Sequence, residues 1–446
     1  MTKIAFIGAG STIFMKNIVG DCLHFDALRD ATFALMDIDA TRLEESALVA
    51  RKMIATMDTD ATVETHSDQR AALNGADFVV TAFQIGGYKP CTVTDFEIPK
   101  QYDLRQTIAD TLGVGGIMRG LRTVPHLWKV AEDMRAVCPG ATLLQYVNPM
   151  AINCWALAER YPDIKQVGLC HSVQNTVQEI AHDLDLPEHE IRYRVAGVNH
   201  VAFFLDLTHQ GRDLYPDLRT GYHTGRLPKP PLLMPRCPNH VRYEVMDHFG
   251  YFCTESSEHL AEYVPWFIKQ DRPDLIEIFG IPLDEYPKRC EEQIANWSTQ
   301  AETLKTAASI DVPKSHEFAA EIMNAQLTNT PYVIYGNLPN TGQLPALPLG
   351  AVVETPCLVD ANGIQPTTVT DLPPQLTAIM RSQINVQELT VRALLDENID
   401  HIYHAAYMDP HTAAELDLRQ IRDLITDLLA AHADWLPDWA RPRKAA

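Results

Sequence analysis

The chain has little positive charge for its length. Its 446 residues carry 37 lysines and arginines against 58 aspartates and glutamates, which gives a formal net charge of −21. A protein that binds the phosphate backbone of nucleic acids or an anionic membrane surface needs a concentrated basic patch. The sequence contains no such patch, so we expect no nucleic-acid partner and no membrane partner.

Long apolar runs and an export signal are also missing. No stretch approaches the roughly 18 apolar residues that span a bilayer, and the opening MTKIAFIGAG lacks the pattern of a signal peptide. The nine cysteines are odd in number and scattered, which favours free thiols over a disulfide framework. These absences predict a cytoplasmic protein. A hydrophobic content of 46% suffices for two or three packed domains.

The first half of the chain alternates short apolar runs with helical patterns. The runs are KIAFIG, ATFALMDID, ADFVVTAFQIGG and ATLLQYVNP. Thr41 and Glu44 match a capping box that opens one of the helices. Such alternation predicts an α/β fold with a Rossmann-like, doubly wound parallel sheet.

The pattern changes near residue 195, where YRVAGVNHVAFFLDL alternates with a period of two, and helical patterns dominate after Val241. We therefore predict one domain over residues 1–195 and a second, mostly helical α+β domain over residues 196–446. The segment 211–240 is rich in proline, arginine and glycine, which predicts a long loop.

A glycine turn follows the first predicted strand. Gly8 and Gly10 match the first two glycines of a dinucleotide fingerprint, while Ile13 stands where the third would be. Asp37 ends the second strand, where a carboxylate would bond the adenosine ribose and favour NAD over NADP, although Arg42 lies nearby. The turn predicts that residues 1–195 bind NAD at a helix N-terminus. The alternative is an ordinary strand-to-helix turn.

Three apolar runs end in polar pairs that share one edge of the predicted sheet. The pairs are Asn148-Pro149, Cys170-His171 and Asn199-His200. A thiolate from Cys170 and an imidazole from His200 would form a two-residue site for a borderline divalent metal, with positions left for substrate oxygens. Taken alone, a buried thiol and a hydrogen-bonded histidine are the better explanation of this pair.

The stretch from Asp110 to Arg122 combines three glycines in four residues with two arginines at helical spacing. This composition suggests a flexible loop that meets a ligand. Asp110 is a candidate general acid or base if burial raises its pKa. A solvated surface turn is the alternative.

These motifs together resemble glycoside hydrolase family 4. The resemblance rests on FIGAGST, MDID, AFQIGG, ADTLGVGGIMRGLRT, YVNPM, GLCHSVQ and GVNH in this order. It continues through GYFCTESSEHLAEYVPWF, LDEYPKRC, CLVDANGIQP and MDPHTA, and spans nearly the whole chain. The longer strings are most similar to the α-galactosidase branch of that family.

The resemblance implies a hydrolysis that differs from the usual scheme of two carboxylates. NAD⁺ takes a hydride from sugar C3, which acidifies the C2 proton, and a divalent metal, usually Mn²⁺, stabilises the enediolate. A base removes the C2 proton, an acid assists the leaving group, water adds, and the hydride returns. NAD is therefore bound but not consumed.

The family pattern also implies roles for individual residues. Cys170 and His200 match the metal ligands, and Asp110 matches the acid that protonates the leaving oxygen. The expected nucleotide-binding residues are Gly8, Gly10, Ser11, Thr12, Asp37, Gln84 and Asn148. The expected sugar-binding residues are Asn148, Arg119, His171 and Asn199.

The base that removes the C2 proton is not settled by the resemblance. The relevant stretch runs from Thr254 to Tyr263, and it has no aspartate at the expected place. Tyr263, Glu255 and Glu258 are the candidates. Alternatively, Glu258 and Glu262 form the exposed face of a helix.

The expected substrate is an unphosphorylated α-galactoside such as melibiose, because the candidate pocket lacks a basic cluster for a 6-phosphate beyond Arg119 and Arg122. A 6-phospho-glycosidase and an α-galacturonidase are the alternatives within the family. A plain NAD-dependent sugar dehydrogenase and a nucleotide sensor are the alternatives outside it. The resemblance further implies a homodimer or homotetramer, in which the second domain binds substrate and contributes to assembly.

Overall fold

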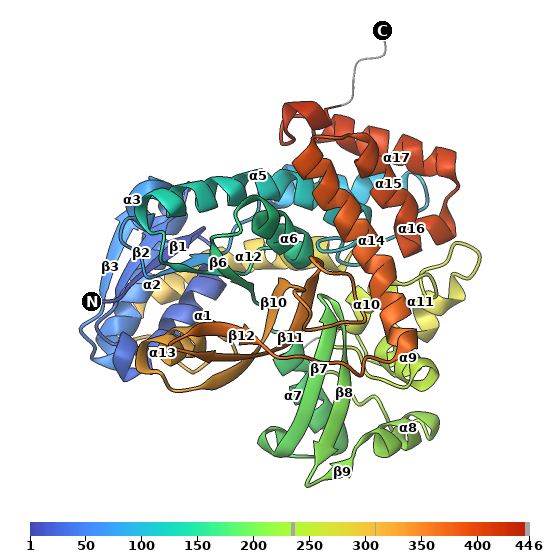
Figure 1. Ribbon diagram of the computed structural model, residues 1–446, viewed down its shortest axis with the longest axis horizontal. Coiled ribbons are helices and arrows are strands. Elements are labelled where there is room, and N and C mark those ends of the chain that lie inside the picture. Colours follow the sequence, from blue (N-terminus) through green and yellow to red (C-terminus); the bar gives the residue numbers. More distant parts are fainter. Residues whose placement is uncertain (233–236, 308, 442–446) are drawn as a thin grey trace.

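The computed structural model describes residues 1–232, 237–307 and 309–441, without the side chains of residues 12, 13 and 298. A sheet of twelve strands runs through the molecule, and helices cover both of its faces (Figure 1). The amino terminus lies at one end of this sheet. The helices near the carboxyl terminus pack together at the other end of the molecule.

Six parallel strands form the first half of the sheet. They are β1 (Lys3–Ile7), β2 (Thr32–Met36), β3 (Thr62–His66), β4 (Phe78–Thr81), β5 (Thr142–Gln145) and β6 (Lys165–Gly168). Their spatial order is β3-β2-β1-β4-β5-β6, which is the order of a dinucleotide-binding fold. The predicted Rossmann-like parallel sheet is confirmed.

Helices follow these strands along the chain, and most of them pack against the sheet. They are α1 (Thr12–Leu23), α2 (Ala40–Met57), α3 (Gln69–Leu73), α4 (Val93–Lys100), α5 (Gly113–Val137), α6 (Met150–Arg160) and α7 (Ser172–Leu184). The prediction that Thr41 caps α2 is wrong. Asp39 is the cap, because its carboxylate accepts hydrogen bonds from the backbone N–H groups of Thr41 and Arg42.

The second half of the sheet is antiparallel. It contains β7 (Ile191–Val198), β8 (Val201–His209), β9 (Arg212–Asp213), β10 (Tyr332–Pro339), β11 (Val352–Asp360) and β12 (Gly363–Pro366). Strands β10 and β11 lie between β6 and β7, so the same sheet continues from the parallel half into the β7–β8 hairpin. The predicted domain boundary at residue 195 falls within β7 and stays a prediction.

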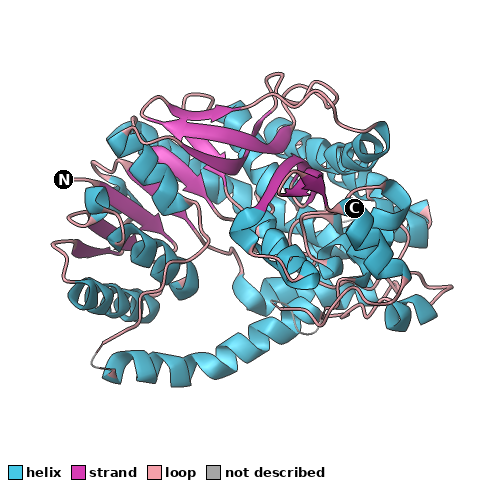
Figure 2. Ribbon diagram, turned by 90° about the horizontal axis from the view of Figure 1, so that it is seen from below, coloured by secondary structure: helices cyan, strands magenta, loops and turns pink. Residues whose placement is uncertain are grey.

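The remaining helices pack around both halves of the sheet. They are α8 (Tyr215–His223), α9 (His240–Phe249), α10 (Ser257–Tyr263), α11 (Asp274–Ile278), α12 (Glu285–Thr306), α13 (Ala319–Thr328), α14 (Pro374–Asp396), α15 (Asp400–Met408), α16 (Pro410–Glu415) and α17 (Leu418–Ala431). The prediction of a long loop or lid over 211–240 is wrong for its first part, because the short β9 and α8 form there. Residues 233–236 of this segment lie outside the described residues. Helix α12 is long and runs along one side of the molecule (Figure 2).

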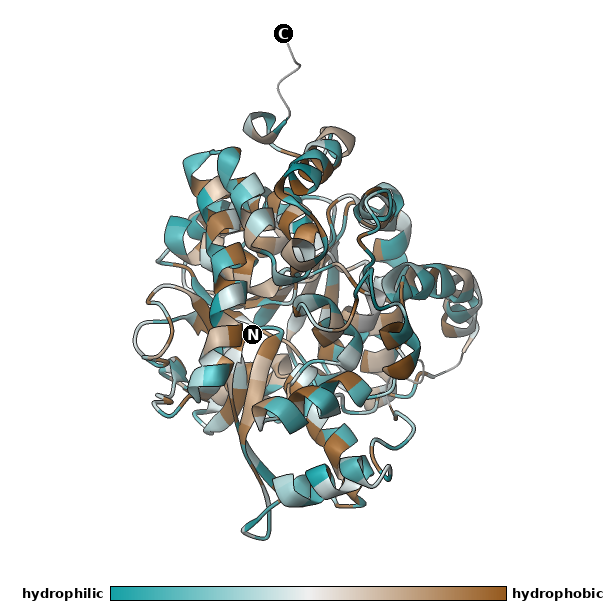
Figure 3. Cartoon of the chain, turned by 90° about the vertical axis from the view of Figure 1, so that its right-hand side faces the viewer, coloured by the Kyte–Doolittle hydropathy of each residue, from teal (hydrophilic) through white to brown (hydrophobic). Residues whose placement is uncertain are grey.

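Apolar residues gather on the inward faces of these helices and on the strands, while polar residues face outward (Figure 3). Helix α17 shows the pattern clearly, since Ile421, Leu424, Ile425, Leu428 and Leu429 are all buried. Among the described residues, no helix is long and apolar enough to cross a membrane.

A buried ionic network fastens the C-terminal helices to the parallel half. The Asp95 carboxylate on α4 accepts hydrogen bonds from both terminal nitrogens of Arg122 on α5, at 2.6 and 3.1 Å. His432, at the end of α17, lies 2.7 Å from the same carboxylate. Burial alone would raise the pKa of Asp95. Arg122 and His432 lower this pKa by more than burial raises it, so the net shift is downward. The carboxylate is therefore ionised at neutral pH.

We expect Asp95→Asn to lower the free energy of unfolding by about 3–5 kcal/mol, because it leaves a buried guanidinium without its counter-ion. Urea denaturation at pH 7 measures the loss. Since the pKa of Asp95 is lowered in the folded state, the difference from the wild type should shrink as the pH falls below about 4. Arg135→Gln, which breaks an exposed ion pair with Asp163, is the control and should change stability little. An equal loss in both variants would contradict the prediction.

Candidate functional site

The glycine turn lies between β1 and α1. Gly8 has a φ of +91°, and a Cβ there would lie 2.5 Å from the carbonyl oxygen of Ala82. A Cβ on Gly10 would lie 2.7 Å from the Asp37 carboxylate, which accepts the Gly10 N–H at the same distance of 2.7 Å. Both positions therefore require glycine. The turn brings Asp37 beside the start of α1, as a nucleotide site needs.

The other predicted nucleotide residues lie at the same edge of the sheet. Ser11 directly precedes α1, and Thr12 is its first residue, but the Thr12 side chain lies outside those that the structure describes. Gln84 follows β4. Its amide donates to the Thr92 hydroxyl at 2.7 Å and accepts from the Tyr286 hydroxyl at 3.3 Å.

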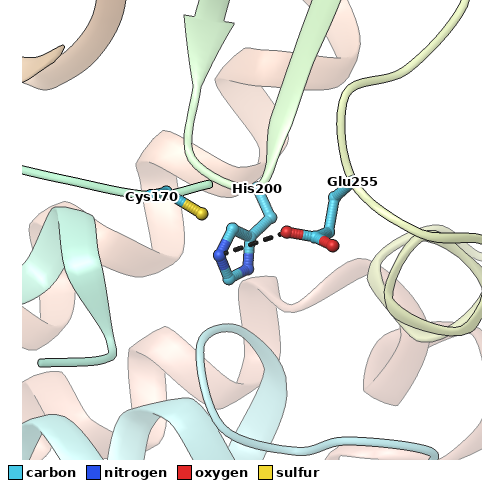
Figure 4. Close-up of side chains that lie close together, drawn as sticks. All are labelled: Cys170, His200 and Glu255. Carbon is cyan, nitrogen blue, oxygen red and sulfur yellow. Dashed lines mark ion pairs between the residues drawn. The ribbon is translucent and has the colours of Figure 1, made fainter. Parts of the chain in front are cut away.

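Cys170, His200 and Glu255 converge on one point (Figure 4). One ligand atom from each residue lies within 4.8 Å of the other two. His200 Nε2 is 3.4 Å from a Glu255 oxygen, and the His200 side chain is 3% exposed. A thiol, an imidazole and a carboxylate form a donor set for a borderline divalent metal. The residues present therefore fit a metal ion.

The sheet sets the positions of Cys170 and His200. Cys170 lies two residues beyond Gly168, at the end of β6, and His200 lies in the turn between β7 and β8. Gly168 pairs with Asn337 on β10, which pairs with Glu354 on β11, which pairs with Gly197 on β7. Cys170 thus lies just beyond one end of a row of paired residues that crosses four strands, and His200 lies just beyond the other end.

The charges around this cluster shift the acidity of its members. Burial raises the pKa of the Cys170 thiol, and Glu255 and Glu354 raise it further. Burial also raises the pKa of Glu255, but His259 and His200 outweigh this effect and lower it to about 2. Glu255 is therefore a carboxylate at neutral pH, whereas the thiol of Cys170 keeps its proton until a cation displaces it.

Tyr263 lies on the other side of His200. Its hydroxyl is 3.5 Å from His200 Nδ1, and the residue is fully buried at the end of α10. Burial raises the pKa of the phenol well above its usual value, and the carboxylates of Asp110, Glu262 and Glu255 act in the same direction. The phenol is protonated in this environment.

Asp110 lies beside two of the predicted sugar-binding residues, Asn148 and Arg119. One of its oxygens accepts from the Asn148 amide at 3.2 Å, and the other accepts from the Thr111 hydroxyl at 2.8 Å. Arg119 is 3.7 Å away and lies over the ring of Tyr286. Burial raises the pKa of Asp110, but Arg119, His259 and His200 lower it below its ordinary value. The upward shift of the pKa that would suit a general acid is therefore absent in the free protein, because a guanidinium and two imidazoles accompany the burial.

The glycine-rich stretch is not a flexible loop. Gly113 begins α5, and Gly115 and Gly116 lie in its first turn. A Cβ on Gly115 would lie 2.3 Å from the Ala109 carbonyl oxygen, and one on Gly116 would lie 2.6 Å from the Thr111 carbonyl carbon. These glycines let α5 pack directly against the segment that carries Asp110.

The expectation of an exposed helix face at Glu258 and Glu262 is wrong. Glu258 is fully buried, and Glu262 is 4% exposed. Both oxygens of Glu258 accept hydrogen bonds from Arg289, at 2.5 and 2.7 Å. Helix α10 is enclosed on all sides, so the usual pattern of one polar face does not apply.

The two remaining sugar-binding candidates have different surroundings. Asn199 is fully buried in the same turn as His200. The His171 side chain is 43% exposed and lies 3.7 Å from the Glu317 carboxylate. Both residues lie next to a candidate metal ligand in the sequence, and their roles stay predictions.

Sequence reasoning missed four residues near this site: His259, Tyr286, Arg289 and Glu354. His259 packs edge-on against His200, with ring centroids 5.2 Å apart. Glu354 is fully buried behind the cluster, where burial raises its pKa to about 7. A glutamate within the apolar run AVVETPCLVD was the available signal, since an acid in a buried strand needs a partner.

The strand order and the glycine turn place the chain in the class of dinucleotide-binding α/β proteins. Comparisons with known proteins define it further. The model of the family 4 glycosyl hydrolases matches residues 3–186, and the model of the C-terminal domain of that family matches residues 195–412. The chain belongs to family 4 of the glycosyl hydrolases, as its motifs predict.

Its relatives include two proteins named alpha-galactosidase. One, from Bacillus subtilis (strain 168), is 45% identical over 98% of this chain and 100% of its own length. The other, from Rhizobium meliloti (strain 1021), is 32% identical over 100% of this chain and 91% of its own. An alpha-galacturonidase from Thermoanaerobacterium saccharolyticum is 26% identical over 98% of this chain and 97% of its own.

Solved structures share the fold. A 6-phospho-alpha-glucosidase from gut microorganisms, in complex with NAD and Mn²⁺, has a TM-score of 0.80 at 18% identity and covers 98% of this chain and 99% of its own. A 6-phospho-beta glucosidase from Thermotoga maritima, with manganese, NAD⁺ and glucose-6-phosphate, has a TM-score of 0.78 at 20% identity and the same coverage.

We expect Glu255→Gln to weaken Mn²⁺ binding about 10-fold or more, because the amide removes the negative charge that faces His200. Titration followed by electron paramagnetic resonance of free Mn²⁺ measures the affinity. Glu258→Gln is the matched control, since it removes a neighbouring buried carboxylate that pairs with Arg289 instead, and it should bind Mn²⁺ as the wild type does. Unchanged affinity in Glu255→Gln would remove Glu255 from the ligand set.

Proposed function

We propose that this protein is an α-galactosidase that uses NAD⁺ and a divalent metal such as Mn²⁺. The observation that carries the proposal is the convergence of Cys170, His200 and Glu255 at the sheet edge that also holds the glycine turn. The 45% identity to a full-length alpha-galactosidase supports the substrate. A soft-ligand metal cluster beside a nucleotide turn fits the redox and elimination route of this family.

Gly8, Gly10, Ser11 and Asp37 would hold the nucleotide, and Cys170, His200 and Glu255 would hold the metal. When bound, NAD⁺ supplies reversible hydride transfer at sugar C3, and the metal supplies positive charge for the sugar oxygens O2 and O3. We assign Asp110 to the proton at the leaving oxygen. Its contacts with Asn148 and Arg119 fix its position and hold it ionised in the free protein, so it must take up a proton before it can donate one.

The base for the C2 proton is one of two residues. Tyr263 and Glu255 both flank His200, whereas both oxygens of Glu258 are bound to Arg289. This bidentate pair makes Glu258 a residue that positions α10 against α12. Glu255 is already ionised, while Tyr263 needs its phenol deprotonated first.

The cations in this region favour a neutral sugar. Arg119 is paired with Asp110, and Arg289 is paired with Glu258 and Glu285. A 6-phosphate or a uronate would have to compete with these carboxylates for a guanidinium. A galactoside with a free 6-hydroxyl needs no such cation.

Addition of cofactors to stripped protein tests this function. We expect hydrolysis of 4-nitrophenyl α-galactoside with NAD⁺, Mn²⁺ and a reductant together, and none when NAD⁺ or Mn²⁺ is left out, with no net absorbance from NADH. Cys170→Ala is the control and should be inactive in every mixture. Accumulation of NADH would identify a dehydrogenase. Cleavage of 6-phosphorylated or uronic acid glycosides, without cleavage of the galactoside, would identify one of the other family activities.

We expect Tyr263→Phe to stop the exchange of the C2 proton with D₂O while Mn²⁺ binding is retained, if the phenol is the base. Nuclear magnetic resonance in D₂O follows both the release of galactose and the deuterium at its C2, and the variant should release almost no galactose because release requires removal of the C2 proton. Deuterium at C2 in the product of Tyr263→Phe, at the wild-type rate, would assign the proton transfer to Glu255 instead.

The oligomeric state and the compartment remain proposals as well. We propose a homodimer or homotetramer in the cytoplasm, in line with the family resemblance and the scattered free cysteines. Size-exclusion chromatography with light scattering determines the number of subunits.

A further inference from the structure

Glu262 lies close to the candidate site, although none of the proposed reaction steps uses it. It lies on α10 next to Tyr263, and its carboxylate is buried. One oxygen accepts the backbone N–H groups of Thr107 and Ile108, at 2.7 and 3.2 Å. The other accepts the N–H of Ala109 at 2.8 Å. Three consecutive backbone donors therefore converge on one side chain.

This segment leads directly into Asp110. Ala109 has a φ of +51°, a left-handed conformation that costs a residue other than glycine about 1 kcal/mol or more. The carboxylate of Glu262 holds the three N–H groups that precede this turn, and the left-handed conformation of Ala109 then directs the chain into Asp110. A further bond joins the same elements, since the Thr107 hydroxyl donates to the Glu258 carbonyl at 2.6 Å.

Other elements hold the segment but do not fix its final turn. The backbone N–H groups of Asp284 and Tyr286 donate to the carbonyls of Gln106 and Thr107 at 3.0 Å each, so α12 holds the start of the segment. Gly115 on α5 packs closely against the backbone of Ala109. Glu262 is the side chain that orients the amides immediately before Asp110.

We propose that Glu262 is a positioning residue that holds Asp110 in place for proton transfer at the leaving oxygen. The proposal rests on the role assigned to Asp110 under the proposed function. Glu262 does not contact Asp110, and it acts through the backbone of residues 107–109. A carboxylate is required, because the amide of glutamine would present its own N–H group to one of the three donors.

The choice of leaving group separates this role from general stabilisation. A group that donates a proton to the leaving oxygen matters for a basic alkoxide such as methoxide, and much less for 4-nitrophenolate, which leaves without help. We expect Glu262→Gln to lower kcat/KM about 100-fold for methyl α-galactoside and only a few-fold for the 4-nitrophenyl compound. Its Mn²⁺ affinity should equal that of the wild type.

A double-mutant cycle provides the decisive comparison. If Glu262 acts through Asp110, the variant with both Asp110→Asn and Glu262→Gln loses no more activity than Asp110→Asn alone. Losses that multiply would overturn the proposal, as would equal losses for both substrates in Glu262→Gln. Glu258→Gln is the matched control, since it alters a buried carboxylate of the same helix that is bound to Arg289, and it should affect both substrates equally.

The design remains informative if Glu262→Gln does not fold. Thr107→Val removes the second bond between the segment and α10 and keeps Glu262, so we expect the same selective loss at a smaller size. An equal effect on both substrates in that variant would count against the proposal.

Failure of the wild type to cleave either galactoside would refute the proposed function instead. If Asp110→Asn shows no preference for the better leaving group, the acid role fails, while losses that do not multiply would still support positioning.

Discussion

One row of paired residues across the sheet holds the two halves of the site together. Gly168, Asn337, Glu354 and Gly197 lie side by side on four neighbouring strands, which are spaced about 4.8 Å apart. The Asn337 amide donates to the Gly168 carbonyl at 3.3 Å and to the Glu354 carboxylate at 3.2 Å. A shift of one residue in this register would reverse every side chain on β10 or β11 and separate Cys170 from His200.

The parallel half could be predicted from the sequence because its signals are local. Each strand is a short apolar run followed by a helix, and the glycine turn and Asp37 lie next to the strands that position them. The pairing of Gly168 with Asn337 joins residues that are 169 positions apart, and no periodicity in the sequence records it. The position of β10 and β11 in the sheet, between β6 and β7, could therefore not be predicted from the sequence.

The candidate site shows the same division. Cys170, His200 and Asn148 were found as the polar ends of apolar runs, which is a rule of topology. Asp110 was found at the head of a stretch rich in glycine and arginine. Glu255 and Tyr263 were found through the motif that contains them, but their surroundings were not. The alternative that Glu258 and Glu262 form an exposed helix face was wrong, because each has a basic or amide partner from a distant segment.

Several of the chain's many acidic residues are buried around the candidate site. Asp110, Glu255, Glu258, Glu262 and Glu354 are all buried or nearly so, and burying that many carboxylates without compensation would be very costly. Partners offset part of this cost for each of them: a guanidinium for Asp110 and Glu258, imidazoles for Glu255, backbone amides for Glu262, and the Asn337 amide for Glu354. Burial still raises the pKa of Glu262 and of Glu354 to about 7. Because Arg119 and Arg289 are bound in these pairs, a ligand meets carboxylates together with their guanidinium partners rather than a guanidinium alone. Acceptors suit the hydroxyl groups of a neutral sugar and the charge of a metal ion, so the arrangement that stabilises the fold also selects what the site can bind.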